Sequence, residues 1–184
     1  MLLVMEPGQA LVMIDTPRLA REDTIIPNQL SEQPDSPYQP EYNWLYVYER
    51  QLFGFLEQWL RPYRHELIGE KGILCEALSN AFCHGHGKDP QKPIVIYIFE
   101  GKKGLLIRIK DNGRGFDVQK VFQQFCGNKQ YYSTAGNGIR RMAESPRFGI
   151  FYDSSGSAFH LLYFYDGALE CVPPNAMIAP ESSR

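Results

Sequence analysis

Two side chains in this sequence have the types and the spacing needed for chemistry at a metal-bound phosphate. Glu76 and Asn80 stand four positions apart in a segment with a helical pattern, and residues at i and i+4 leave the same face of a helix. A carboxylate near a terminal phosphate can accept the proton of an attacking hydroxyl or water. A carboxamide oxygen suits Mg²⁺, which prefers oxygen ligands. We therefore expect Glu76 to be a general base and Asn80 to be a magnesium ligand.

Glycines define two further segments that could hold a ligand. Asp111-Asn-Gly113-Arg-Gly115 follows an alternating strand pattern at residues 106–110, and its glycines let the backbone approach a flat ligand closely. Gly136-Asn137-Gly138 opens a later helical pattern, where free backbone N–H groups could receive phosphate. Together with Glu76 and Asn80, these segments predict a Mg-nucleotide site.

Each of these residues also has a simpler explanation. A glutamate on a helix surface is usually solvated, and an asparagine can form a local hydrogen bond to the backbone. Asp-Asn-Gly is a common turn sequence. The order of the segments along the chain, rather than any one of them, favours the nucleotide site.

Helical and strand patterns place these segments in one domain. The chain has 184 residues, of which 43% are hydrophobic, so it can bury one good core. Strand pairs are expected at 94–100 with 105–110 and at 148–152 with 158–165, helices at 44–62, 66–84 and 139–144, and a small mobile flap at 117–135.

The two ends of the chain are expected to lie outside this domain. Leu11 to Ile14 could form a short first strand, but residues 16–43 carry five prolines and few apolar anchors. We predict an irregular proline-rich arm at 1–43, a nucleotide-binding domain at 44–168 and a flexible tail at 169–184.

Four segments, in the order in which they follow one another along the chain, resemble the ATP-binding domain shared by gyrase, histidine kinase, heat-shock chaperone and MutL proteins. These proteins form the GHKL superfamily. Within it, the chain is most similar to bacterial anti-sigma-factor serine/threonine kinases, over roughly residues 45–166. The resemblance implies an α/β (α+β) two-layer sandwich of the Bergerat type, with a mixed, mainly antiparallel sheet covered on one face by helices. The segments are Glu76-Ala-Leu-Ser-Asn80-Ala-Phe-Cys-His84-Gly85, Asp111-Asn-Gly113-Arg-Gly115-Phe-Asp117, Gly136-Asn137-Gly138-Ile-Arg-Arg-Met and Gly156-Ser157.

The resemblance also implies ATP and Mg²⁺ as cofactors. Asp111 would accept a hydrogen bond from the exocyclic amino group of adenine, where guanine presents oxygen. Ser157 stands where relatives hold a water at the same edge of the base, and His84 lies at the end of the helix that carries the base. The other residues assigned to the nucleotide are Asn80, Gly113, Gly115, Gly136, Asn137 and Gly138, although many relatives have more glycines in the last segment.

Composition narrows the functional class. A formal net charge of -2 at pH 7 gives no broad basic field for nucleic acid. The four cysteines are neither paired in C-x-x-C spacing nor dense enough for a secreted disulfide scaffold, which favours the cytoplasm. The short apolar start lacks a signal peptide's features, and no segment has the roughly 20 apolar residues of a membrane span.

Two histidine-containing segments suggest other chemistry. Cys83-His84-Gly-His86 is rich in zinc-type ligands, but no further ligand stands at a suitable spacing. His65-Glu66-Leu67 is similar to a histidine kinase phosphoacceptor segment, yet the interval before Glu76 is too short for a separate dimerising hairpin. We therefore expect neither a zinc site nor histidine autophosphorylation within this chain alone.

The leading hypothesis is a cytoplasmic Mg²⁺-ATP-dependent serine/threonine protein kinase of the anti-sigma-factor type. Its partner would be a small regulatory protein, either an antagonist-like substrate or a sigma factor, and the resemblance leaves room for a homodimer. Two alternatives remain open: a nucleotide-dependent protein-interaction module without phosphotransfer, and a stand-alone histidine-kinase-like ATPase domain acting in trans.

Overall fold

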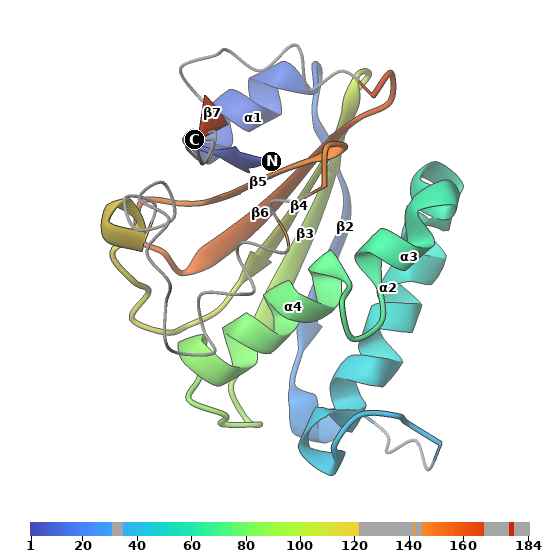
Figure 1. The fold of residues 1–184 in the computed structure, drawn as a ribbon, viewed down its shortest axis with the longest axis vertical. Helices are drawn as coiled ribbons and strands as arrows, with labels where there is room; N and C mark the ends of the chain where they lie inside the picture. The colour runs from blue at the N-terminus through green and yellow to red at the C-terminus, as the bar shows by residue number, and fades with distance from the viewer. Residues whose placement is uncertain (31–34, 122–141, 143–144, 168–176, 179–184) are drawn as a thin grey trace, which may run out of the picture.

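The computed structural model describes residues 1–30, 35–121, 142, 145–167 and 177–178. Within these residues a seven-stranded sheet has the order β2-β3-β4-β6-β5-β1-β7 (Figure 1). Its strands are β1 Leu2–Leu3, β2 Arg18–Ile25, β3 Ile94–Glu100, β4 Gly104–Lys110, β5 Phe148–Tyr152, β6 Ala158–Phe164 and β7 Met177–Ile178. The helices are α1 Pro7–Met13, α2 Asn43–Leu60, α3 Arg64–Leu67 and α4 Ile73–Asn80, which continues into a π-helical turn at Ala81–Gly85.

The sheet is mixed and mainly antiparallel. Strand β1 pairs with β5 in parallel, whereas every other pair of neighbouring strands in the described part is antiparallel. Helices α2, α3 and α4 lie together on one face of this sheet (Figure 1). The predicted two-layer α/β fold of the ATP-binding type is therefore confirmed.

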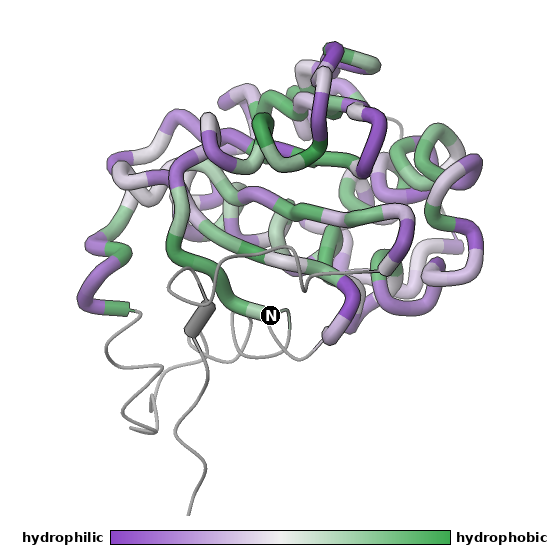
Figure 2. Tube along the Cα trace, turned by 90° about the horizontal axis from the view of Figure 1, so that it is seen from above, coloured by the Kyte–Doolittle hydropathy of each residue, from purple (hydrophilic) through white to green (hydrophobic). Residues whose placement is uncertain are grey.

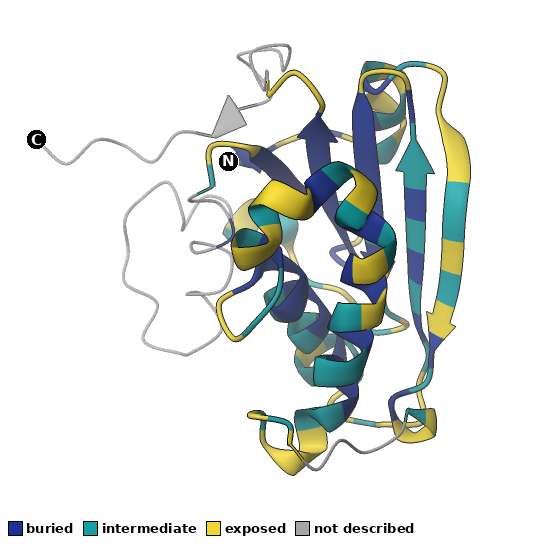
Figure 3. Ribbon diagram, turned by 90° about the vertical axis from the view of Figure 1, so that its right-hand side faces the viewer, coloured by how far each residue is buried: buried dark blue, intermediate teal, exposed yellow. Residues whose placement is uncertain are grey.

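The main core lies between this face and the helices. Isoleucines at alternate positions of β3 are buried, as are alternate residues of β4, because successive side chains of a strand point to opposite faces. The sides of the helices that face the sheet are also buried (Figure 3). Among the residues that meet there are Ile94, Ile96, Ile98, Leu105, Ile107, Ile109, Leu52, Leu56, Leu74 and Leu78.

A smaller core lies on the opposite face of the sheet, where α1 packs. Ala10 and Ile14 contact a cluster that includes Leu106, Phe151 and Leu162. Each of these three residues stands next in sequence to a strand residue of the main core. The same strands therefore supply both cores. Apolar residues accordingly gather in the central strands, and hydrophilic residues in the peripheral loops (Figure 2).

Two predictions for the start of the chain are wrong. Leu11 to Ile14 belong to the end of a helix, not to a strand, because Pro7 occupies its first turn and Glu6 and Gln9 form a capping box. Residues 16–43 are not irregular throughout, because Arg18–Ile25 form β2 and pair along the length of β3. β2 is an edge strand whose residues are mostly exposed or half-exposed. It therefore lacks the apolar alternation by which strands were predicted from the sequence.

Other expected elements are largely confirmed. The helix at 44–62 and the four strands of the two predicted hairpins appear within a few residues of their expected bounds. The helix predicted at 66–84 is divided, since α3 ends at Leu67 and α4 begins at Ile73. The predicted tail contains β7, paired with β1. Most of the expected flap and of the helix at 139–144 lies outside the described residues.

One buried histidine on the face opposite α2 to α4 gives stability a pH dependence. The His160 ring is fully buried and stacks on Phe151, with centroids 4.5 Å apart and planes 5° apart. Neither ring nitrogen has a hydrogen-bond partner of normal geometry in the described structure. Burial, and then the neighbouring Arg108 charge, lower the His160 pKa to about 4.

We therefore predict that the free energy of unfolding falls as the pH drops from 6.5 towards 4, because the unfolded chain binds the His160 proton more tightly. The loss attributable to this group between about pH 7 and about pH 5 is roughly 2 kcal/mol. Urea unfolding of His160→Phe should show a flatter pH dependence. His65→Phe, at an exposed position on α3, is the control, and equal slopes for His160→Phe and the unmodified chain would contradict the prediction.

Candidate functional site

Helix α4 carries the candidate base and the candidate metal ligand. Its inner face, with Leu74, Ala77 and Leu78, is buried in the main core. Glu76 and Asn80 are half-buried on a different face, as the spacing of four residues predicts. The apolar stripe of the helix therefore fixes the direction in which these two polar side chains point.

The end of β4 meets the end of α4 at Asp111. The Asp111 N–H donates to the Ser157 carbonyl at 3.0 Å, and its Oδ1 accepts from the Gly113 N–H at 2.7 Å. The carboxylate lies so close to Gly85, in the π-helical turn after α4, that a Cβ there would overlap it. Burial raises the pKa of Asp111, while the Gly113 hydrogen bond acts in the opposite direction. Segments far apart in the sequence thus meet at one half-buried carboxylate.

Glycines allow three backbone segments to pack closely around this carboxylate. A Cβ at Gly113 would overlap the Gly85 carbonyl, and one at Gly115 would overlap the Ser155 carbonyl. Gly115 and Gly156 have φ of 68° and 69°, a region that favours glycine. The loop after Asp111 therefore lies between the end of α4 and the β5–β6 turn, and its glycines are needed for the protein's own packing.

Ser157 lies in the β5–β6 turn, next to Asp111. Its hydroxyl is 2.7 Å from the Ser155 hydroxyl. The Asp153 carboxylate accepts from the Ser155 hydroxyl at 2.9 Å and from the N–H of Ser157 at 3.2 Å. The structure thus brings Ser157 to the same corner as Asp111, as the family resemblance implies, and holds it there through Asp153.

The two neighbouring histidines have different environments. His84 is exposed at the end of the π-helical turn. His86 is buried, and its Nε2 accepts from the Asn112 N–H at 3.2 Å. Burial lowers the pKa of His86, so its imidazole is neutral at pH 7 and can act as this acceptor. In the sequence, His86 stands out only as a zinc-type ligand, whereas in the structure its contact supports the loop that follows Asp111.

Tyr152 is a site residue that the sequence prediction missed. It ends β5, and its ring packs edge-on against Phe116 with centroids 4.8 Å apart. Burial raises the pKa of its hydroxyl, and the Glu76 and Asp111 charges act in the same direction, whereas the neighbouring Asn80 side chain acts in the opposite one. Its position at a strand end directly before the Asp153 turn is the only sequence signal that could have indicated this role.

The residues present fit magnesium held mainly by other ligands. No three His, Cys, Asp or Glu side chains in the described ranges are grouped closely enough to hold a metal ion. Mg²⁺ commonly binds through one or two protein oxygens, with phosphate and water completing its shell. Asn80 can supply such an oxygen next to Glu76. Gly136, Asn137 and Gly138, expected at the phosphates, lie outside the described residues.

Comparison with known proteins identifies the family of this domain. The sequence model of the family described as histidine kinase-like ATPase domain matches residues 51–144, just over half of the chain. The match includes the segments of Glu76, Asn80 and Asp111, whereas Ser157 lies beyond it. The chain therefore belongs to the histidine kinase-like ATPase domain family.

Two curated relatives are sensor proteins named VraS, from two strains of Staphylococcus epidermidis. Each is 39% identical to this chain over 57 residues. That segment covers 31% of this chain and 15% of each sensor protein, so the comparison concerns a small part of those proteins.

None of the helices in the described ranges is long and apolar enough to cross a membrane.

We predict that Asp111→Asn weakens ATP binding and stabilises the nucleotide-free fold. Loss of one charged hydrogen bond to adenine should lower affinity by about one to two decades. Because the fold raises the pKa of Asp111, the ionised carboxylate destabilises the nucleotide-free fold once the pH has risen through that pKa. The uncharged Asn side chain avoids this cost at pH 7. Calorimetric titration with ATP and GTP, together with thermal unfolding, measures both effects. Unchanged ATP affinity would contradict the adenine contact.

Gly85→Ala should weaken ATP binding through Asp111. The added methyl group would overlap the Asp111 carboxylate, which is the end of a flexible side chain and can move at modest cost. We expect ATP affinity to fall nearly as far as in Asp111→Asn, with a melting temperature close to that of the unmodified chain. Gly54→Ala in α2, where a Cβ meets no atom within 4 Å, is the control. Full affinity in Gly85→Ala would show that the carboxylate position does not matter.

Proposed function

We propose that this protein is a Mg²⁺-ATP-dependent serine/threonine protein kinase of the anti-sigma-factor type. The observation that carries the proposal is the location of Glu76 and Asn80, half-buried on the same face of α4, with Tyr152 beside the Asn80 side chain. A carboxylate in this place can act as a base on a hydroxyl nucleophile. Its substrate would be a small regulatory protein in the cytoplasm, and the kinase could act as a homodimer.

The residues of the site divide the work of the proposed reaction. Glu76 takes the proton of the partner's hydroxyl as that oxygen forms a bond to the γ-phosphorus and the bond to the ADP oxygen breaks. Asn80 would hold Mg²⁺, which when bound neutralises charge on the phosphates. Asp111 orients the adenine through its amino group, and Ser157 supports the same edge of the base.

A second candidate function is supported by the similarity to sensor proteins and to the histidine kinase-like family. In this alternative the chain would supply ATP to a phosphoacceptor histidine on another protein. His65-Glu66 within the chain is less suited to that role, because Glu66 accepts from the Ser145 hydroxyl at 2.7 Å and pairs with Arg147 at 3.5 Å. An interaction module that binds nucleotide without phosphotransfer is the third alternative.

Incubation with γ-labelled ATP and candidate partners separates these functions. We expect acid-stable label on a partner hydroxyl, whereas acid-labile label would indicate histidine and unlabelled proteins would indicate a binding module. Glu76→Gln should bind ATP as tightly as the unmodified chain and lose at least about a hundred-fold in transfer rate. Glu57→Gln, at a surface ion pair with Arg61, is the matched control. Full transfer by Glu76→Gln would rule out Glu76 as the base.

A further inference from the structure

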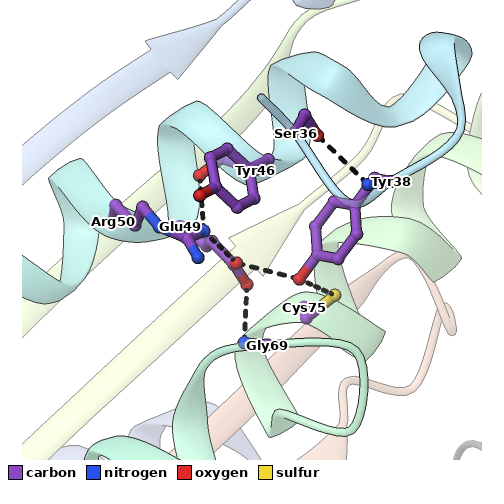
Figure 4. A network of polar contacts seen from close by, with 7 residues as sticks. All are labelled: Ser36, Tyr38, Tyr46, Glu49, Arg50, Gly69 and Cys75. Atoms are coloured by element: carbon purple, nitrogen blue, oxygen red, sulfur yellow. Dashed lines mark hydrogen bonds and ion pairs between the residues drawn. The ribbon is translucent and has the colours of Figure 1, made fainter. Parts of the chain in front are cut away.

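A buried carboxylate in α2 lies at the centre of a polar network that leads to the candidate base. Glu49 has 0% exposure. Its Oε1 accepts from the Tyr38 hydroxyl at 2.9 Å and from Arg50 at 2.7 Å, and its Oε2 accepts from the Gly69 N–H at 3.1 Å (Figure 4). An ionised carboxylate away from water is costly unless paired and hydrogen-bonded. These donors satisfy it.

The Gly69 contact continues through the backbone into the first turn of α4. The Gly69 carbonyl accepts from the Gly72 N–H at 2.7 Å, and the Gly72 carbonyl accepts from the Glu76 N–H at 2.9 Å. Gly69 has φ of 92°. A Cβ at Gly72 would lie 2.6 Å from Ile68 Cα. The turn is thus held in one tight conformation, and a series of three hydrogen bonds joins the Glu49 carboxylate to the Glu76 backbone.

A second route reaches the same helix through Tyr38. The Tyr38 hydroxyl donates to Glu49 and accepts from the Cys75 thiol, with Sγ and Oη 3.6 Å apart. Cys75 directly precedes Glu76 in α4. Burial raises the pKa of Cys75 to about 12 and also raises that of Tyr38, so both groups keep their protons and remain donors at pH 7. The segment before α2 is therefore attached to α4 as well.

We infer that Glu49 is a positioning residue that fixes the first turn of α4, and with it the Glu76 carboxylate, for phosphotransfer. The fully buried Glu49 bonds to Tyr38, Arg50 and the Gly69 N–H, so its effect on the reaction would come through the placement of the base. A displacement of about 1 Å at a reacting group can cost about a hundred-fold in rate. The inference rests on the proposed function, because it assigns Glu49 a role in the reaction that Glu76 would perform.

The kinetic test compares Glu49→Ala, Glu49→Gln and Tyr38→Phe in the full chain. Glu49→Ala should lower kcat by about ten-fold to a hundred-fold, with ATP Kd and KM within about two-fold, because adenine and phosphate contacts are retained. Glu49→Gln keeps an acceptor for the Gly69 N–H and should recover most of kcat. Tyr38→Phe removes one hydroxyl and should give a smaller loss, of about three-fold to ten-fold.

Glu66→Ala is the matched control, because Glu66 is also a hydrogen-bonded, partly buried carboxylate but joins α3 to Ser145 and Arg147 instead of α4. If Glu49→Ala lowers kcat no more than Glu66→Ala, or raises KM by the same factor as it lowers kcat, the positioning role is overturned. A merely structural role would reduce stability in both variants without this separation of kcat from KM.

Amide hydrogen exchange tests the same inference without activity. Peptides from residues 69–80 should exchange faster in Glu49→Ala, while peptides from 104–110 keep their protection. If Glu49→Ala does not fold, the same comparison is made with Tyr38→Phe. Unchanged exchange at 69–80 would overturn the inference. Absence of turnover in the unmodified chain would instead count against the proposed kinase function, and the exchange result would still decide whether Glu49 fixes α4.

Discussion

The contact between the Asp111 carboxylate and the backbone of Gly85 is the constraint on which the site depends. It sets the end of α4 against the end of β4, and a side chain at Gly85 would displace the Asp111 carboxylate. The close approach of Gly113 to Gly85 and of Gly115 to Ser155 follows from the same arrangement. The price is a half-buried carboxylate with a raised pKa, a common compromise where a charged group is held ready for a ligand.

Helix α4 is held in three different ways along its length. Its first turn is hydrogen-bonded through Gly69 to a buried carboxylate, and its middle is packed by Leu74 and Leu78 into the main core. At its far end, His86 accepts from the loop that follows Asp111. Apolar packing alone tolerates small shifts, whereas directional hydrogen bonds at both ends limit sliding and rotation. If α4 carries both a base and a metal ligand, as proposed, it would benefit from this restraint.

Helical periodicity allowed the α4 face to be predicted, because the spacing of Glu76 and Asn80 encodes it locally. The fold class and the meeting of Asp111 with Ser157 followed instead from the resemblance to the ATP-binding family. It could not show β2, whose residues face solvent on an edge, nor the division of the helix between Leu67 and Ile73. Tyr152 and Glu49 were missed for another reason. A tyrosine in an apolar strand and a glutamate in an amphipathic helix look ordinary until tertiary packing places them next to the site or within the core.

Strand β2 changes what counts as the smallest unit of this fold. The family match starts at residue 51, inside α2, yet β2 pairs with β3 over residues 18–25, and the Tyr48 hydroxyl donates to Asp23 at 2.6 Å. A fragment cut at the family boundary would leave the hydrogen-bonding edge of β3 open and available to strands of other molecules. Residues 18–25 therefore replace the apolar edge of β3 with an edge strand rich in charged residues, a composition that disfavours pairing with other strands.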